Sequence, residues 1–127
     1  MAQHARVRHL ESPHDISDLI RQVPVVVALF GRRDCTECAY VYQRLERFVS
    51  RRSDYECIYV DLDQQPTLAG MHAVYEVPTT VVHVYATQIS KQVGGIDLPK
   101  LRRDAEHVKE QVRNMQAEER GEASQES

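Results

Sequence analysis

Two cysteines separated by two residues, Cys35 and Cys38, are the residues of this sequence best suited to chemistry. They follow the apolar run 25–30 and precede a helical pattern, so both thiols are expected at a junction between a strand and a helix. Free backbone amides and the positive end of the macrodipole at a helix N-terminus favour a thiolate, which makes Cys35 the predicted nucleophile. The spacing therefore predicts a pair built to exchange disulfides.

The elements around this pair follow from hydrophobic periodicity. Apolar residues at helical spacing predict helices, and β-branched runs predict strands. Helices are expected over 12–22, from 38 to about 50, over 66–75 and over 98–115, with strands over 25–30, 55–62, 79–85 and 88–93. A parallel crossover followed by an antiparallel hairpin predicts an α/β fold with a central mixed sheet between helices.

The length and composition narrow the possible functions. A chain of 127 residues fits one domain, and a net charge of -3 gives no support for nucleic-acid binding. No apolar stretch reaches the length that spans a bilayer, and the polar first residues lack the apolar core of a secretory signal. We therefore expect no membrane partner and a cytoplasmic location. The predicted organisation is an N-terminal extension over 1–11, one domain over 12–115 and a disordered acidic tail over 116–127.

Further landmarks follow the cysteine pair along the sequence. Asp63-Gln64-Gln65-Pro66 follows the second predicted strand, Val77-Pro78-Thr79 precedes the third, and Val93-Gly94-Gly95 precedes the last helix. Together with the Cys-x-x-Cys pair, these segments occur in the order and near the spacing found in the thioredoxin-like family, which the sequence resembles over about residues 12 to 112. The resemblance implies the three-layer α/β/α thioredoxin-like fold.

The resemblance also implies roles for individual residues. Cys35 would attack a client disulfide and Cys38 would resolve the mixed disulfide. Pro78 would be a cis-proline facing the dithiol, and the backbone of Val77 would offer hydrogen bonds to a bound peptide. Gly94, with Gly95 beside it, would let the client chain lie close to the site.

Two acidic residues near this site bear on the choice of client. Asp34 directly precedes the first cysteine, and Glu76 directly precedes the Val-Pro-Thr segment. They predict clients with basic surroundings. Asp34 and Glu37 oppose thiolate formation at Cys35, whereas Arg32 and Arg33 favour it.

The sequence also departs from the family pattern. It carries Cys-Thr-Glu-Cys in place of Cys-Gly-Pro-Cys and contains no tryptophan. The buried acid that serves proton transfer in thioredoxins falls at Leu29, and the proline that kinks the helix falls at Gln43. Leu29 removes the usual general base for Cys38.

Other uses of the cysteines and histidines are open. Zinc would need two ligands beyond the cysteine pair, and His72 and His83 lack the close spacing of a zinc motif. An iron–sulfur cluster bridged between two chains by Cys35 is a further alternative. Cys57 lies among apolar residues of a predicted strand, where a buried inert thiol is usual. We predict no metal and no bound cofactor.

The leading functional interpretation is a thiol-disulfide oxidoreductase acting in cell redox homeostasis. Its Cys35/Cys38 dithiol would exchange with the disulfides of client proteins, and a reductase not identified by the sequence would restore the dithiol. The alternative is a redox-inactive thioredoxin-fold binding module or assembly subunit. The long last helix and the acidic tail support that alternative, since both add surface that a minimal thioredoxin lacks.

Overall fold

A five-stranded mixed sheet in the order β1-β3-β2-β4-β5 forms the middle layer of the molecule. The computed structural model describes residues 7–9 and 14–121. The strands are β1 (Val7–His9), β2 (Val25–Gly31), β3 (Tyr55–Asp61), β4 (Thr79–Val84) and β5 (Thr87–Val93). The helices are α1 (His14–Gln22), α2 (Thr36–Ser50), α3 (Thr67–Met71) and α4 (Leu98–Glu119).

The central strand β2 is buried along its whole length because helices cover both faces of the sheet. It pairs in parallel with β3 and antiparallel with β4, while β1 adds to β3 in parallel and β5 adds to β4 antiparallel. Uninterrupted apolar sequence is typical of such a doubly covered strand. The predicted α/β fold with a mixed sheet is therefore confirmed.

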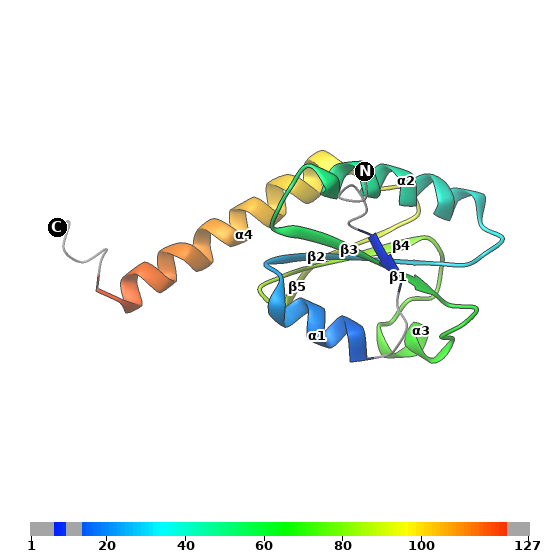
Figure 1. Cartoon of the computed structure of the whole chain (residues 1–127), viewed down its shortest axis with the longest axis horizontal. Coiled ribbons are helices and arrows are strands. Elements are labelled where there is room, and N and C mark those ends of the chain that lie inside the picture. Colours follow the sequence, from blue (N-terminus) through cyan, green and yellow to red (C-terminus); the bar gives the residue numbers. More distant parts are fainter. Residues whose placement is uncertain (1–6, 10–13, 122–127) are drawn as a thin grey trace.

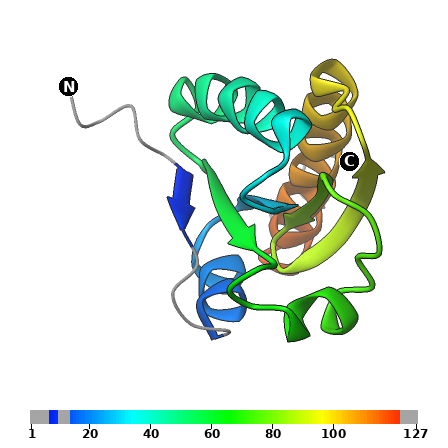
Figure 2. The same ribbon diagram turned by 90° about the vertical axis from the view of Figure 1, so that its right-hand side faces the viewer.

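The helices form two outer layers, with α2 and α4 on one face and α1 and α3 on the other (Figures 1 and 2). Alternate residues of β2 separate the two cores. Val25, Val27 and Leu29 belong to the core beneath α2 and α4, whereas Val26, Ala28 and Phe30 belong to the core beside α1 and α3. This period of two fixes which side chains of the strand can reach the cysteine pair at the start of α2.

Three boundaries differ from the sequence-based expectation. Val7–His9, which we assigned to an N-terminal extension, forms β1 and pairs with Cys57–Tyr59 of β3. Helix α3 covers only Thr67–Met71 of the predicted 66–75, and α4 continues to Glu119 rather than ending at Met115. The first four residues of the predicted disordered tail are therefore helical. Residues 1–6, 10–13 and 122–127 of the predicted extension, first helix and tail lie outside the described residues.

Helix α4 is unusual in leaving the body of the molecule. Its N-terminal half buries Leu101 and Ala105, and its C-terminal half extends beyond the sheet (Figure 1). In the described ranges 7–9 and 14–121, no helix has the length and apolar character needed to cross a membrane.

Candidate active site

The candidate site lies at the sheet edge where β2 and β3 end and β4 begins. The register places Gly31 opposite Asp61 and Phe30 opposite Thr79, while Thr79 also lies opposite Val93 at the end of β5. Segments from four parts of the chain therefore meet at one edge. The Cys-x-x-Cys pair, the Val-Pro-Thr segment and the Gly-Gly segment are all adjacent to it in the sequence.

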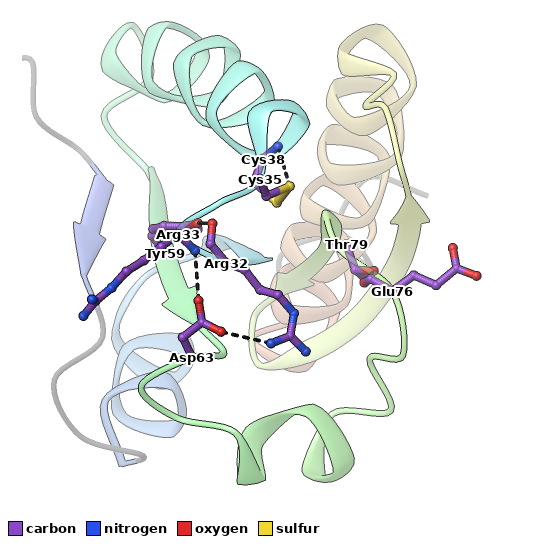
Figure 3. The surroundings of a disulfide bond; sticks show 8 residues. All are labelled: Arg32, Arg33, Cys35, Cys38, Tyr59, Asp63, Glu76 and Thr79. Atoms are coloured by element: carbon purple, nitrogen blue, oxygen red, sulfur yellow. Dashed lines mark hydrogen bonds and ion pairs between the residues drawn. A yellow bond between two sulfur atoms is a disulfide. The ribbon is translucent and has the colours of Figure 1, made fainter.

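Cys35 and Cys38 form a disulfide at the N-terminus of α2 (Figure 3). Cys35 is the N-cap residue, and its sulfur accepts a hydrogen bond from the Cys38 amide at 3.0 Å. Cys35 is partly exposed, whereas Cys38 is 1% exposed. A thiolate on Cys35 would have the same amide as its donor, which is the arrangement that activates a cysteine at a helix N-terminus. Of the two cysteines, Cys35 is therefore the more accessible one.

The loop between β2 and Cys35 is held by the end of β3. Arg32 donates to Asp63 Oδ1 at 3.0 Å, and the Arg33 amide donates to Asp63 Oδ2 at 3.1 Å (Figure 3). These hydrogen bonds lower the pKa of the Asp63 carboxyl, and the bond from the Arg33 amide has the largest effect. The Arg33 side chain also lies 3.6 Å from Asp61 Oδ2. Both positive charges that could favour a thiolate at Cys35 are thus already paired with carboxylates.

Tyr59 of β3 also contacts the loop between β2 and Cys35, and no sequence pattern predicts this contact. Its hydroxyl donates to the Arg32 carbonyl at 3.3 Å. A Cβ on Gly31 would lie 2.5 Å from the Tyr59 hydroxyl oxygen, so glycine is required at this end of β2. Beside the loop, the rings of Tyr42, Tyr59 and His9 line a hollow of about 490 Å³ that reaches Cys35. This contact depends on the tertiary fold, because the glycine and the tyrosine are 28 positions apart in the sequence.

The Val-Pro-Thr and Gly-Gly segments come together next to the dithiol helix. The Val77–Pro78 peptide bond is cis, and the Gly94 amide donates to the Pro78 carbonyl at 2.8 Å. Gly94 has φ of +85°, and a Cβ built on it would lie 3.9 Å from a carboxylate oxygen of Glu37. Since Glu37 is in the first turn of α2, the helix that carries the cysteines contacts the segment that carries the glycine. Sequence reasoning treated Glu37 only as a neighbouring charge and missed this approach.

The remaining predicted site residues are less close. Asp34 and Glu76 are both exposed, and the Glu76 side chain points away from the disulfide (Figure 3). The backbone carbonyl of Glu76 accepts a hydrogen bond from the Thr79 hydroxyl at 2.6 Å. Val77 is partly buried against the core beside α1 and α3. The structure therefore brings Cys35, Cys38, Gly94 and Pro78 to one edge, whereas the Glu76 carboxylate stands outside it.

Leu29 is fully buried under α2 and carries no proton-accepting group. It lies in register with Tyr59 of β3 on one side and with Thr80 of β4 on the other. Thr80 is also fully buried, and its hydroxyl has no hydrogen-bond partner within the described part of the chain. The polar side chain in register with Leu29 on β4 is therefore a threonine, not an acid. Neither residue supplies a carboxylate that could act as a base for Cys38.

The other cysteine and the two histidines do not join the site. Cys57 is fully buried, and its burial, together with Glu46, raises the pKa of its thiol. His83 lies in register with Val26, whose side chain enters the core on the opposite face of the sheet from α2. Burial lowers the pKa of His72 and His83 alike. Within residues 7–9 and 14–121, no three His, Cys, Asp or Glu side chains gather as a metal-ligand set.

Known structures share this architecture at low sequence identity. Mitochondrial thioredoxin 3 from Saccharomyces cerevisiae superposes with a TM-score of 0.70 at 20% identity, over 82% of this chain and 98% of that one. Fasciola hepatica thioredoxin gives 0.68 at 24% identity, over 79% and 97%. A putative oxidoreductase with a thioredoxin fold gives 0.72 at 20% identity, over 84% and 98%. Neither protein-family models nor curated protein sequences match the chain. The comparisons show that the chain has the thioredoxin fold.

Proposed function

We propose that this protein is a thiol-disulfide oxidoreductase that uses Cys35 and Cys38 to reduce disulfides of client proteins. The Cys35 thiolate attacks one sulfur of the client disulfide, and the other client sulfur leaves as a thiolate that takes up a proton. The Cys38 thiol then loses its proton and attacks the Cys35 sulfur. This step releases the second client thiol and forms the Cys35–Cys38 disulfide, so two electrons pass from the protein to the client.

The observation that carries the proposal is the disulfide at the N-terminus of α2 with unequal exposure of its two cysteines. The partly exposed Cys35 is the one that a client would reach, and the Cys38 amide, 3.0 Å from the Cys35 sulfur, would stabilise negative charge on it. The buried Cys38 would react only with the mixed disulfide that Cys35 forms with the client. A structural disulfide has no need for this division between an accessible and a shielded sulfur.

The client would lie across Pro78 and Gly94. Gly94 has a positive φ and no side chain, and its amide donates to the Pro78 carbonyl. The two residues therefore leave the backbone accessible to a client chain. The Val77 backbone would bond the client chain. Glu37 approaches Gly94, and Asp34 directly precedes Cys35. Neither side chain forms an ion pair among the described residues, which supports clients with basic residues near the disulfide. The Glu76 carboxylate would attract such clients only through longer-range electrostatics.

A reductase would return the disulfide to the dithiol, and the cytoplasm is the compartment we propose, since thiols there are kept reduced. The chemistry needs no bound cofactor or metal. The domain proposed to carry it is the thioredoxin-fold unit of residues 12–115, to which the structure adds β1.

The alternative, a redox-inactive binding module, draws support from two observations. Leu29 leaves Cys38 without the base that the family places there, and α4 extends beyond the body as additional surface. The two functions make opposite predictions about whether the cysteines matter for partner capture.

Reduction of a protein disulfide under one chemical reductant separates the two functions. We expect wild-type activity that is abolished in Cys35→Ser and unchanged in Cys57→Ser, which is the matched control because that thiol is buried and remote from clients. Cys38→Ser should accumulate a mixed disulfide through Cys35. Equal rates for wild type and Cys35→Ser, with no trapped partner in Cys38→Ser, would instead support the binding module.

The Leu29→Asp variant tests the resolving step. A carboxylate at this position should act as a general base for Cys38 and raise turnover about tenfold or more at neutral pH. Since the variant loses buried apolar packing and buries an acid, the free energy of unfolding should fall by about 2 kcal/mol or more. Lower turnover in a folded Leu29→Asp protein would show that proton removal from Cys38 does not limit the reaction.

A further inference from the structure

Four arginines surround one hollow at the opposite end of α2 from the dithiol. The hollow has a volume of about 350 Å³ and is lined by Arg44, Arg47, Arg51, Arg52, Phe48 and Leu98. No carboxylate is among these residues, although the whole chain has a net charge of -3. We call this group of six residues the arginine hollow.

Capping of the helix does not account for all four arginines. The last carbonyls of α2 are already bonded, since Ser50 donates to the Arg47 carbonyl at 2.9 Å and Arg52 donates to the Phe48 carbonyl at 2.7 Å. Arg44 lies six residues before the end of the helix, beyond the last turn in which the macrodipole attracts cations. Arg47 lies in the last turn, Arg51 is the C-cap residue and Arg52 bonds a terminal carbonyl, whereas the helix end does not account for Arg44.

Two of the arginines are fixed in place as walls of the arginine hollow. Arg52 stacks on the Phe48 ring, with its guanidinium carbon 3.8 Å from the ring centroid. Arg44 donates to the Ile96 carbonyl at 3.1 Å, which joins α2 to the segment before α4. A guanidinium has five N–H donors, so both keep donors for a ligand after these bonds. The site is thus partly organised before a ligand arrives.

Carboxylates close in sequence to the residues of the arginine hollow are bonded to other groups. Asp97 accepts the Lys100 amide as the N-cap of α4, Asp54 pairs with Lys109, and Asp104 pairs with Lys100. Arg44, Arg47 and Arg51 form no ion pair within the described part of the chain. Arg44 and Arg47 lie in α2 and Arg51 is its C-cap residue, so the three arginines follow one another at spacings of three and four. Like charges at such spacings destabilise a helix, so the protein keeps this arrangement at a cost in stability.

We propose that the arginine hollow binds a small anion that carries two or more phosphate groups. Each phosphate contributes about -1.5 to -2 charges near neutral pH, so two phosphates match four guanidinium groups. Arg44 and Arg51 are about 10 Å apart along the helix axis, which is wider than one phosphate. Guanidinium groups bind phosphate oxygens with paired hydrogen bonds.

An extended polyanion fits this surface less well. The next arginines along α4, Arg102 and Arg103, line a separate hollow together with Asp104, Glu106 and Glu110. A nucleic-acid strand leaving the arginine hollow in this direction would meet carboxylates. The positive surface is therefore local, as a compact oligophosphate requires.

Titration calorimetry of the full chain with pyrophosphate, at low salt and without magnesium, tests the proposal. We expect saturable binding of one pyrophosphate, weakened about tenfold or more in the Arg47→Gln/Arg51→Gln variant, as charge-assisted hydrogen bonds are lost. The matched control is Arg102→Gln/Arg103→Gln, which removes the same charge beside carboxylates and should bind as wild type does. A melting temperature no lower than that of wild type in both variants shows that neither has lost its fold.

Three results would overturn the proposal. The first is the absence of saturable binding, and the second is an equal loss of affinity in the two variants, which would indicate attraction by net charge alone. The third is tighter binding of a hexaglutamate peptide than of pyrophosphate, which would assign the hollow to an acidic protein segment.

Discussion

The two ends of α2 differ in how side chains are held and in what remains free. At the N-terminal end, the exposed sulfur of Cys35 takes the place of a capping oxygen, and Glu37 reaches toward Gly94. At the C-terminal end, Phe48 packs edge-on against Tyr55, and Tyr55 donates to Glu106 of α4 at 2.5 Å. The N-terminal end presents a partly exposed cysteine, whereas the C-terminal end is attached to Tyr55 of β3 and through it to α4.

Electrostatics distinguish the same two ends. The acidic residues Asp34 and Glu37 lie at the positive end of the helix dipole, and the arginines lie at the negative end. Both placements are favourable toward the helix dipole, but the arginines also repel one another, and the acidic residues also compete with a Cys35 thiolate. Charges suited to the helix are therefore not the charges best suited to the nucleophile.

The strongest contrast should be between Cys35 at the start of α2 and Cys57 beneath the helix. In the fully reduced protein at pH 7, an alkylating reagent should modify Cys35 at least about 100 times faster than Cys57, because burial raises the pKa of the Cys57 thiol and blocks access. Peptide mass spectrometry over time measures both rates, and labelling in urea supplies the unprotected reference. Comparable rates in the folded protein would remove the contrast.

The loop before the nucleophile should tolerate less change than an open helical position. Gly31→Ala places a methyl 2.5 Å from the Tyr59 hydroxyl oxygen, so the free energy of unfolding should fall by about 1–3 kcal/mol. Gly70→Ala is the control, because no atom lies within 4 Å of the position that its Cβ would take and alanine favours a helix. Urea denaturation compares the variants. Wild-type stability in Gly31→Ala would mean that Tyr59 does not close the loop.

At the C-terminal end of α2, Tyr55→Phe should lower the free energy of unfolding by about 1–2 kcal/mol at pH 7, because Glu106 loses a hydrogen bond. Burial alone would raise the pKa of Glu106, but bonds from Tyr55 and Lys109 outweigh it and lower the pKa. The stability from these bonds is present above the ordinary carboxyl pKa and is lost as pH falls through the lowered one.

The difference between wild type and Tyr55→Phe should therefore shrink from pH 7 to pH 3. Urea denaturation at both pH values measures it, with Tyr40→Phe as a control whose ring is 60% exposed. A difference that grew toward pH 3 would contradict the role of the Glu106 carboxylate.

The mildest change should come from Glu37. Glu37→Gln removes negative charge from the turn that begins at Cys35, so alkylation of Cys35 at pH 7 and low salt should become about two to five times faster. The gain should decrease at high salt, which screens exposed charges. Glu110→Gln, on the far half of α4, should leave the rate unchanged. A slower reaction in Glu37→Gln would show that the carboxylate assists the nucleophile.

Much of the fold was predictable because local sequence and tertiary environment agree. The run 25–30 is apolar throughout, as a strand covered on both faces requires, and the Cys-x-x-Cys and Val-Pro-Thr segments identified the edge where the site lies. Strand β1 was missed because three residues carry no periodicity, and its pairing with Cys57–Tyr59 is a tertiary property. The predicted end of α4 was too early, since Gln116–Glu119 form helix through intrinsic propensity without an apolar stripe.

The cysteines could be predicted from the sequence, but their surroundings could not. The approach of Glu37 to Gly94 and of Tyr59 to Gly31 joins residues far apart in the chain. The arginines of α2 are typical of a solvated helix face when only the sequence is considered, because nothing local shows that Arg44 bonds the Ile96 carbonyl. Spacing along one helix predicts which face residues share, whereas the partner of that face depends on the fold.

The reduction potential of the Cys35/Cys38 pair decides whether the start of α2 carries an exchanging dithiol or a structural disulfide. The wild-type protein would be equilibrated with thiol–disulfide buffers of known potential, and mass spectrometry of alkylated samples would give the reduced fraction. An exchanging dithiol predicts a reversible two-electron transition between about -270 and -120 mV, the range of known dithiol proteins. A potential below about -300 mV, as in structural disulfides, or a pair that does not oxidise reversibly, would contradict the proposed exchange.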